Sequence, residues 1–155
     1  MTIICIKDNI IAADSLVSNR EGRIISTITK KITRSIDGAV GGAAGDEMAC
    51  ARFLKWFGSS TAKDRGIQTS FPINLPEGEF RAIWLSQYGS VCEMNHQGYV
   101  VFLETSIAAI GSASNMALGA MLAGFSARDA VQLCINNYIS CGGDSVHVLP
   151  LKGTN

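Results

Sequence analysis

Paired short apolar segments separated by tight turns constrain the fold of this chain more than any other feature. Two such pairs lie in the first 44 residues, and branched side chains are common in both. The expected strands are 2–7 and 9–14 in the first pair, divided by Asp8-Asn9, and 31–36 and 39–44 in the second, divided by Asp37-Gly38. Asp-Asn and Asp-Gly favour the backbone conformation of a two-residue hairpin turn. These pairs therefore predict antiparallel β-sheets.

Three further segments carry the signals of helices. Apolar residues recur at helical spacing from 46 to 57, directly after Gly45, and acidic residues open that segment. A second helix is expected over 113–123, before Gly124. A third is expected over 126–138, where Ser126 and Asp129 resemble a capping box.

The second half of the chain adds more strands and one long loop. The expected strands are 80–87, 90–94, 98–103 and 145–151. Residues 58–79 are rich in Gly, Ser, Thr and Pro and predict a loop. Neither side of that loop could form a core alone, so we expect a single domain over 1–155. Antiparallel sheets with grouped helices predict a layered α+β fold.

Composition excludes several classes of function. Thirteen basic residues balance thirteen acidic ones, so the chain has no charge field that would gather nucleic acid. No apolar run approaches the roughly 18 residues that span a bilayer. Lys7 and Asp8 stand where a signal peptide would be apolar, so a cytoplasmic location and no membrane partner are expected.

Cysteine and histidine spacing gives no metal or redox motif. The five cysteines are scattered without a C-x-x-C pair, and we expect most to be buried thiols. His96 falls in a turn and His147 in the last strand, and neither has a carboxylate or cysteine at metal-ligand spacing. We therefore expect no metal and no cofactor.

Several short motifs in one order resemble the proteasome β-subunit and HslV-like family of N-terminal-nucleophile hydrolases. They are Thr2 after Met1, AADS at 12–15, KKI at 30–32, AAGD at 43–46, AIGSAS at 109–114 followed by ALGAMLAG, and CGG at 141–143. Each is weak alone, but their joint order is hard to obtain by chance. The resemblance implies a four-layer αββα sandwich, in which two antiparallel sheets lie between helical layers.

The same resemblance implies that Thr2, freed by removal of Met1, is the catalytic residue. In this family the first residue of the mature chain attacks the peptide carbonyl with its side chain, and its α-amino group is the base. The reference pKa of an α-amine is roughly 8, close enough to neutrality for that role. Threonine is also small enough for an aminopeptidase to remove the methionine before it.

Four other residues match the family's site. Lys31 matches the lysine beside the nucleophile, and Asp14 matches the carboxylate that keeps that lysine charged and oriented. Gly45 matches the glycine whose backbone N–H forms the oxyanion hole. Ser112 matches a serine near the free amine.

The match is imperfect near the C-terminus, and each residue also has a plain structural explanation. Where proteasome subunits have an aspartate and a serine, this chain has Tyr138 and Cys141. Asp14 could begin a turn, Lys31 could be a solvated strand residue and Gly45 a strand-to-helix joint. Ser112 and Ser114 could be N-caps of the following helix.

The sequence is therefore consistent with two functions. The first is a threonine peptidase, assembled into a homo-oligomeric ring and supplied with unfolded polypeptide by an ATP-dependent unfoldase. The second is an inactive relative that keeps the fold and its self-association as a scaffold. Removal of Met1 distinguishes them, because a retained methionine leaves Thr2 without a free amine.

Overall fold

The computed structural model describes residues 2–66, 71, 75 and 79–152. Met1 and most of the second half of the loop expected at 58–79 lie outside the described residues. Within them the chain forms antiparallel sheets and three helices, as the sequence predicts. No helix among these residues is long and apolar enough to cross a membrane.

One sheet has four strands and contains the N-terminal hairpin. In spatial order its strands are β10 (Ala108–Gly111), β1 (Ile3–Lys7), β2 (Ile10–Ala13) and β11 (His147–Pro150). Asp8 and Asn9 join β1 to β2 with φ angles of 53° and 59°. Positive φ at both central residues is what a type I′ hairpin turn requires, and Asp and Asn tolerate it better than most residues.

The second sheet has five strands that follow one another in sequence. They are β5 (Ile32–Arg34), β6 (Val40–Gly45), β7 (Phe80–Leu85), β8 (Val91–Met94) and β9 (Val100–Leu103). Asp37-Gly38 forms the turn between β5 and β6, and Gly38 has a φ of 92°. All five strands overlap the expected segments, and every neighbouring pair is antiparallel; β5, β7, β8 and β9 are shorter than predicted, and β6 is shifted by one residue.

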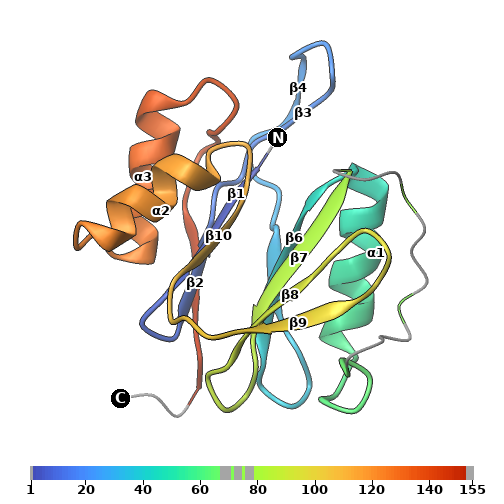
Figure 1. The fold of residues 1–155 in the computed structure, drawn as a ribbon. Helices are drawn as coiled ribbons and strands as arrows, with labels where there is room; N and C mark the ends of the chain where they lie inside the picture. The colour runs from blue at the N-terminus through green and yellow to red at the C-terminus, as the bar shows by residue number, and fades with distance from the viewer. Residues whose placement is uncertain (1, 67–70, 72–74, 76–78, 153–155) are drawn as a thin grey trace.

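The helices lie on the outer sides of the two sheets (Figure 1). Helix α1 (Glu47–Gly58) packs against the five-stranded sheet, and α2 (Ser114–Leu122) and α3 (Ala127–Asn137) pack against the four-stranded sheet. Asp46 caps α1 by accepting a hydrogen bond from the Ala49 N–H at 2.9 Å. Ser126 caps α3 by accepting one from the Asp129 N–H at 3.1 Å.

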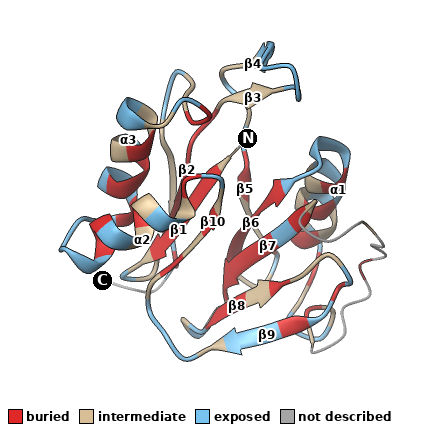
Figure 2. Cartoon of the chain, turned by 45° about the horizontal axis from the view of Figure 1, so that its top comes forward, coloured by how far each residue is buried: buried red, intermediate tan, exposed pale blue. Residues whose placement is uncertain are grey.

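Apolar side chains gather in three clusters that alternate with the sheets. The middle cluster joins the facing sides of both sheets and includes Ile4, Ile83 and Leu85. A second cluster lies between the four-stranded sheet and α2 and α3, and a third lies between the five-stranded sheet and α1. Strands buried on both faces explain the near-continuous apolar runs such as IICI in β1 (Figure 2). Burial of both sheets therefore fixes where their ends, and the candidate site, must lie.

Two local features were not predicted from the sequence. β3 (Val17–Ser18) and β4 (Ile24–Ser26) pair into a small hairpin in which Ile24 and Ile25 are exposed. Neither Ser112 nor Ser114 caps α2: the N-cap is Ala113 and has no side-chain hydrogen bond. Ser114 is already the first helical residue, so its side chain is past the capping position.

Candidate active site

The backbone of Thr2 is held where β1 begins, beside the end of β10. The Thr2 carbonyl accepts a hydrogen bond from the Ser112 N–H at 3.1 Å. The next N–H along the chain, that of Ile3, donates to Asp14 Oδ1 at 3.1 Å. Thr2 itself is half-buried. Two contacts distant in sequence therefore fix the position of this residue.

Asp14 is fully buried at the end of β2, and its carboxylate is surrounded by donors. Oδ1 accepts from the Ile3 N–H and from Lys31 Nζ, the latter at 2.8 Å. Oδ2 accepts from the Gly142 N–H at 3.1 Å. A buried charge is tolerated only when it is paired and hydrogen-bonded, and this carboxylate is both.

Lys31 forms the other half of a buried ion pair. Its residue is 5% exposed, and its ammonium also donates to the Leu16 carbonyl. Burial lowers the pKa of Lys31 below its usual range, and the Asp14 carboxylate opposes that shift only in part. Lys31 is therefore not a solvated strand residue, and Asp14 does more than begin a turn.

Gly45 ends β6, one residue before the N-cap of α1, and is exposed. Its φ is 121°, and a Cβ placed there would lie 2.0 Å from the Glu79 carbonyl oxygen. Only glycine fits that approach.

Ser112 follows β10 and is exposed. Its N–H is used by the Thr2 carbonyl, while its hydroxyl forms no hydrogen bond with any residue that the structure describes. Four of the five candidate residues are thus connected by direct or adjacent hydrogen bonds. Gly45 shares no hydrogen bond with the others within the described part of the chain.

Tyr138 and Cys141, where the chain departs from the motif that it resembles, follow the end of α3. Tyr138 is the C-cap of α3, and its carbonyl accepts a hydrogen bond from the Cys141 N–H at 3.1 Å. Burial, with the Asp14 charge, raises the pKa of the Cys141 thiol to about 12. A thiol with so high a pKa is a poor nucleophile at neutral pH. The site therefore offers little support for cysteine chemistry.

Sequence reasoning missed the backbone groups that position Asp14 and Thr2. Gly142 appeared only within a motif, yet its N–H binds Asp14 and its carbonyl accepts from the N–H groups of Ser15 and Leu16. Gly111 was not singled out, yet it pairs with Ile3 directly beside Thr2. The glycine of AIGSAS and the two glycines of CGG were the available signal, because glycine permits such close backbone approach.

Within the described residues no three metal-ligating side chains lie close enough together to hold an ion.

Comparison with known proteins finds a solved structure with a similar architecture. The crystal structure of HslV from Trypanosoma brucei superposes with a TM-score of 0.64 and covers 97% of this chain and 99% of that one, at 22% sequence identity. The chain has an HslV-like fold. No known family profile matches the sequence, and no curated protein matches it either. The likeness to HslV is thus one of fold, and it assigns no role to any residue here.

A substitution at Gly111 tests how the HslV-like fold positions Thr2. Gly111 has a φ of 111°, and an added Cβ would lie 1.8 Å from the Thr2 carbonyl oxygen. We expect Gly111→Ala to lower the free energy of unfolding by at least about 2 kcal/mol, through backbone strain and displacement of Thr2. Urea unfolding measures the change. Gly119→Ala is the matched control, because Gly119 lies in α2 with no atom within 4 Å of its Cβ position. Equal stability of the two variants would contradict the close packing around Thr2.

The lowered pKa of Lys31 predicts a pH dependence of stability. Between that lowered value and 10.5, the unfolded chain keeps a proton that the folded chain has released. The Lys31 contribution to the free energy of unfolding must therefore rise with pH through that window. Buried cysteines act in the opposite direction, because their raised pKa values make the folded chain hold protons longer. The difference between the native chain and Lys31→Met isolates Lys31, and a difference that falls as pH rises would refute the shift.

Proposed function

We propose that this chain is the subunit of a threonine peptidase that uses Thr2 as nucleophile once Met1 has been removed. The observation that carries the proposal is the buried Asp14–Lys31 ion pair hydrogen-bonded to the backbone directly beside Thr2. An HslV-like fold with a threonine at this position supports the same reading. The alternating clusters of the core fit the four-layer αββα sandwich of such enzymes.

The chemistry proceeds by acyl transfer. The Thr2 hydroxyl oxygen attacks the peptide carbonyl carbon, and its proton passes to the α-amine of Thr2, directly or through water. The C–N bond of the substrate then breaks, the leaving amine takes that proton, and an ester to Thr2 remains. Water hydrolyses the ester by the same route, releasing the acid and restoring the hydroxyl.

Four residues assist that reaction in our proposal. The Lys31 ammonium favours the deprotonated forms of the neighbouring amine and hydroxyl, and Asp14 fixes its orientation. The Gly45 N–H stabilises the oxyanion, a contact typically worth about 3 kcal/mol of barrier. The exposed hydroxyl of Ser112 holds or relays the proton near the amine.

Assembly and location belong to the same proposal. Subunits form a homo-oligomeric ring in the cytoplasm, and unfolded polypeptide is delivered by an ATP-dependent unfoldase. Ile24 and Ile25 of β4 and Ile28, which follows that strand, are exposed apolar residues that such assembly would cover.

One observation favours an alternative, a catalytically inactive scaffold with the same fold. Tyr138 and Cys141 replace polar groups that the family places near the amine, and the Cys141 thiol is buried. Such a chain would keep Met1 and its self-association and would hydrolyse no peptide.

Intact mass and covalent labelling on one sample separate the two functions. The peptidase predicts a protein lighter by one methionine that gains a single peptide epoxyketone or boronate at Thr2 and cleaves a fluorogenic peptide. A homogeneous Met-bearing chain from its native source, inert to both reagents, would favour the scaffold. Labelling at Cys141 instead would refute the mechanism.

A further inference from the structure

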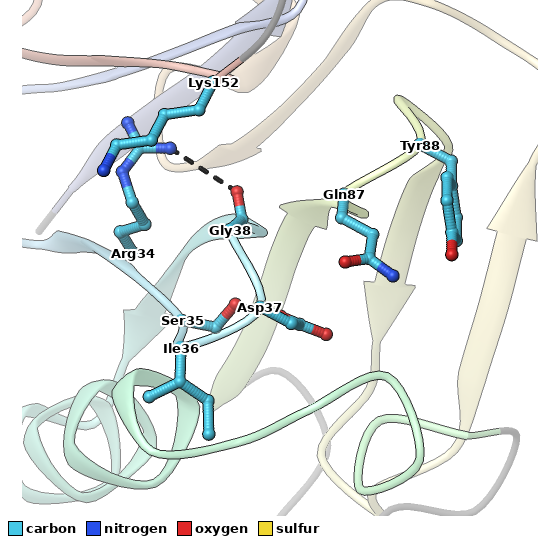
Figure 3. A pocket seen from close by; sticks show the side chains of 8 residues that line it. All are labelled: Arg34, Ser35, Ile36, Asp37, Gly38, Gln87, Tyr88 and Lys152. Atoms are coloured by element: carbon cyan, nitrogen blue, oxygen red, sulfur yellow. Dashed lines mark hydrogen bonds between the residues drawn. The ribbon is translucent and has the colours of Figure 1, made fainter.

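A pocket of about 410 Å³ lies at the end of the five-stranded sheet opposite Gly45. It is formed by the β5–β6 turn, by Gln87 and Tyr88 of the β7–β8 turn, and by Lys152 after β11. Figure 3 shows the Arg34 and Lys152 side chains together at one end and Tyr88 at the other, with Gln87 between them. None of these residues takes part in the proposed peptidase chemistry.

The cationic end of the pocket has no carboxylate counter-ion among the described residues. Arg34 donates to two carbonyl oxygens, that of Pro150 at 2.5 Å and that of Gly38 at 3.4 Å. Lys152 is exposed, and no described carboxylate forms an ion pair with it or with Arg34. Two cations converging without an anion create a positive potential that favours binding of an oxyanion.

Asp37 also lines the pocket, but its carboxylate is already paired with another cation. Arg65 donates to both of its oxygens at 2.7 Å, and Ser35 and the Ala62 N–H donate as well. Arg65 is 4% exposed and stacks over Phe57, so this pair is a fixed part of the fold. Asp37 therefore does not neutralise the cationic end.

The opposite end of the pocket suits a planar group. The Tyr88 side chain is 85% exposed and forms no ring contact with another aromatic residue that the structure describes. Ile36 adds an exposed apolar wall, and the Gln87 amide offers both a donor and an acceptor. A volume of about 410 Å³ lies within the range of small-molecule sites in proteins.

We propose that this pocket binds a small molecule in which an oxyanion, phosphate or carboxylate, is joined to a planar ring. The oxyanion lies between Arg34 and Lys152, and the ring lies against Tyr88. The site is independent of Thr2, because the two lie at opposite ends of the sheets and share no residue.

Four matched probes test the proposal by ligand-observed NMR titration of the full chain. Phenyl phosphate and benzoate carry both a ring and an anion, whereas phenol and inorganic phosphate carry one each. We expect saturable binding of at least one of the first two, about tenfold tighter than either single-feature probe. Tighter binding of phenyl phosphate identifies phosphate as the anion, and tighter binding of benzoate identifies carboxylate.

Variants assign each end of the site. Lys152→Gln should weaken the preferred probe by about tenfold or more, whereas Lys55→Gln, on the exposed face of α1, should not. Tyr88→Ala should weaken the ring-bearing probe severalfold without affecting inorganic phosphate, and Tyr88→Phe should bind like the native chain. These positions avoid Arg34, whose contacts support the fold. No saturable binding, or binding unchanged in both Lys152→Gln and Tyr88→Ala, would overturn the proposal.

Discussion

Thr2→Ala is expected to abolish peptide hydrolysis while leaving the fold intact. The substitution removes the hydroxyl of the proposed nucleophile but keeps the hydrogen bond from the Ser112 N–H to the carbonyl of residue 2 and that from the Ile3 N–H to Asp14. Loss of a nucleophile typically lowers kcat by several orders of magnitude, on the order of 10⁶ in a well-studied serine protease. A fluorogenic peptide assay measures turnover, and circular dichroism with thermal unfolding measures the fold.

Thr2→Ser is the matched control for that experiment. Serine keeps a hydroxyl and an α-amine and is also small enough for methionine removal, so measurable turnover and labelling by an epoxyketone should remain. The two variants should unfold at nearly the same temperature. Retained hydrolysis in Thr2→Ala would place the catalytic site elsewhere.

Lys31→Ala is expected to have the largest effect on stability. Among the described residues it leaves the fully buried Asp14 carboxylate with the N–H groups of Ile3 and Gly142 as its donors. Removing one partner of a buried ion pair typically costs about 3–5 kcal/mol. For a chain of this size that corresponds to a fall in Tm on the order of 10 °C.

The neighbouring Lys30 provides a control of the same residue type. Lys30 is exposed, so Lys30→Ala should change the free energy of unfolding by less than about 0.5 kcal/mol. A double variant, Asp14→Ala with Lys31→Ala, should be less destabilised than the sum of the single variants, because no unpaired charge remains. Equal effects at Lys30 and Lys31 would mean that the ion pair is solvated.

Activity separates a structural from a catalytic role for Lys31. The assay is run well below the Tm of the variant, so that most of the chain is folded. If Lys31 acts on the Thr2 amine and hydroxyl, Lys31→Ala has no turnover even when it is folded. Full turnover of the folded variant would limit Lys31 to holding Asp14 in place.

Local chemistry predicted the elements well because turns and caps depend on residues close in sequence. Asp8-Asn9 and Asp37-Gly38 form the expected turns, and Ser126 caps the expected helix. Two local features were missed: Ala113 rather than a serine is the N-cap of α2, and β3 and β4 form an additional hairpin. In the β3–β4 hairpin Ile24 and Ile25 are exposed, so the sequence has no alternation of apolar and polar residues that would predict these strands.

The sequence alone determined which residues were candidates, and only the tertiary structure decided which of them meet. Asp14 and Lys31 are 17 residues apart, and the Gly142 N–H that completes the carboxylate is 128 residues from Asp14. The order of the motifs identified Thr2, Asp14 and Lys31 as candidates. It did not identify the N–H groups that donate hydrogen bonds to Asp14. Those donors are backbone groups, which every residue carries, and only packing of the two sheets determines which N–H lies beside which oxygen.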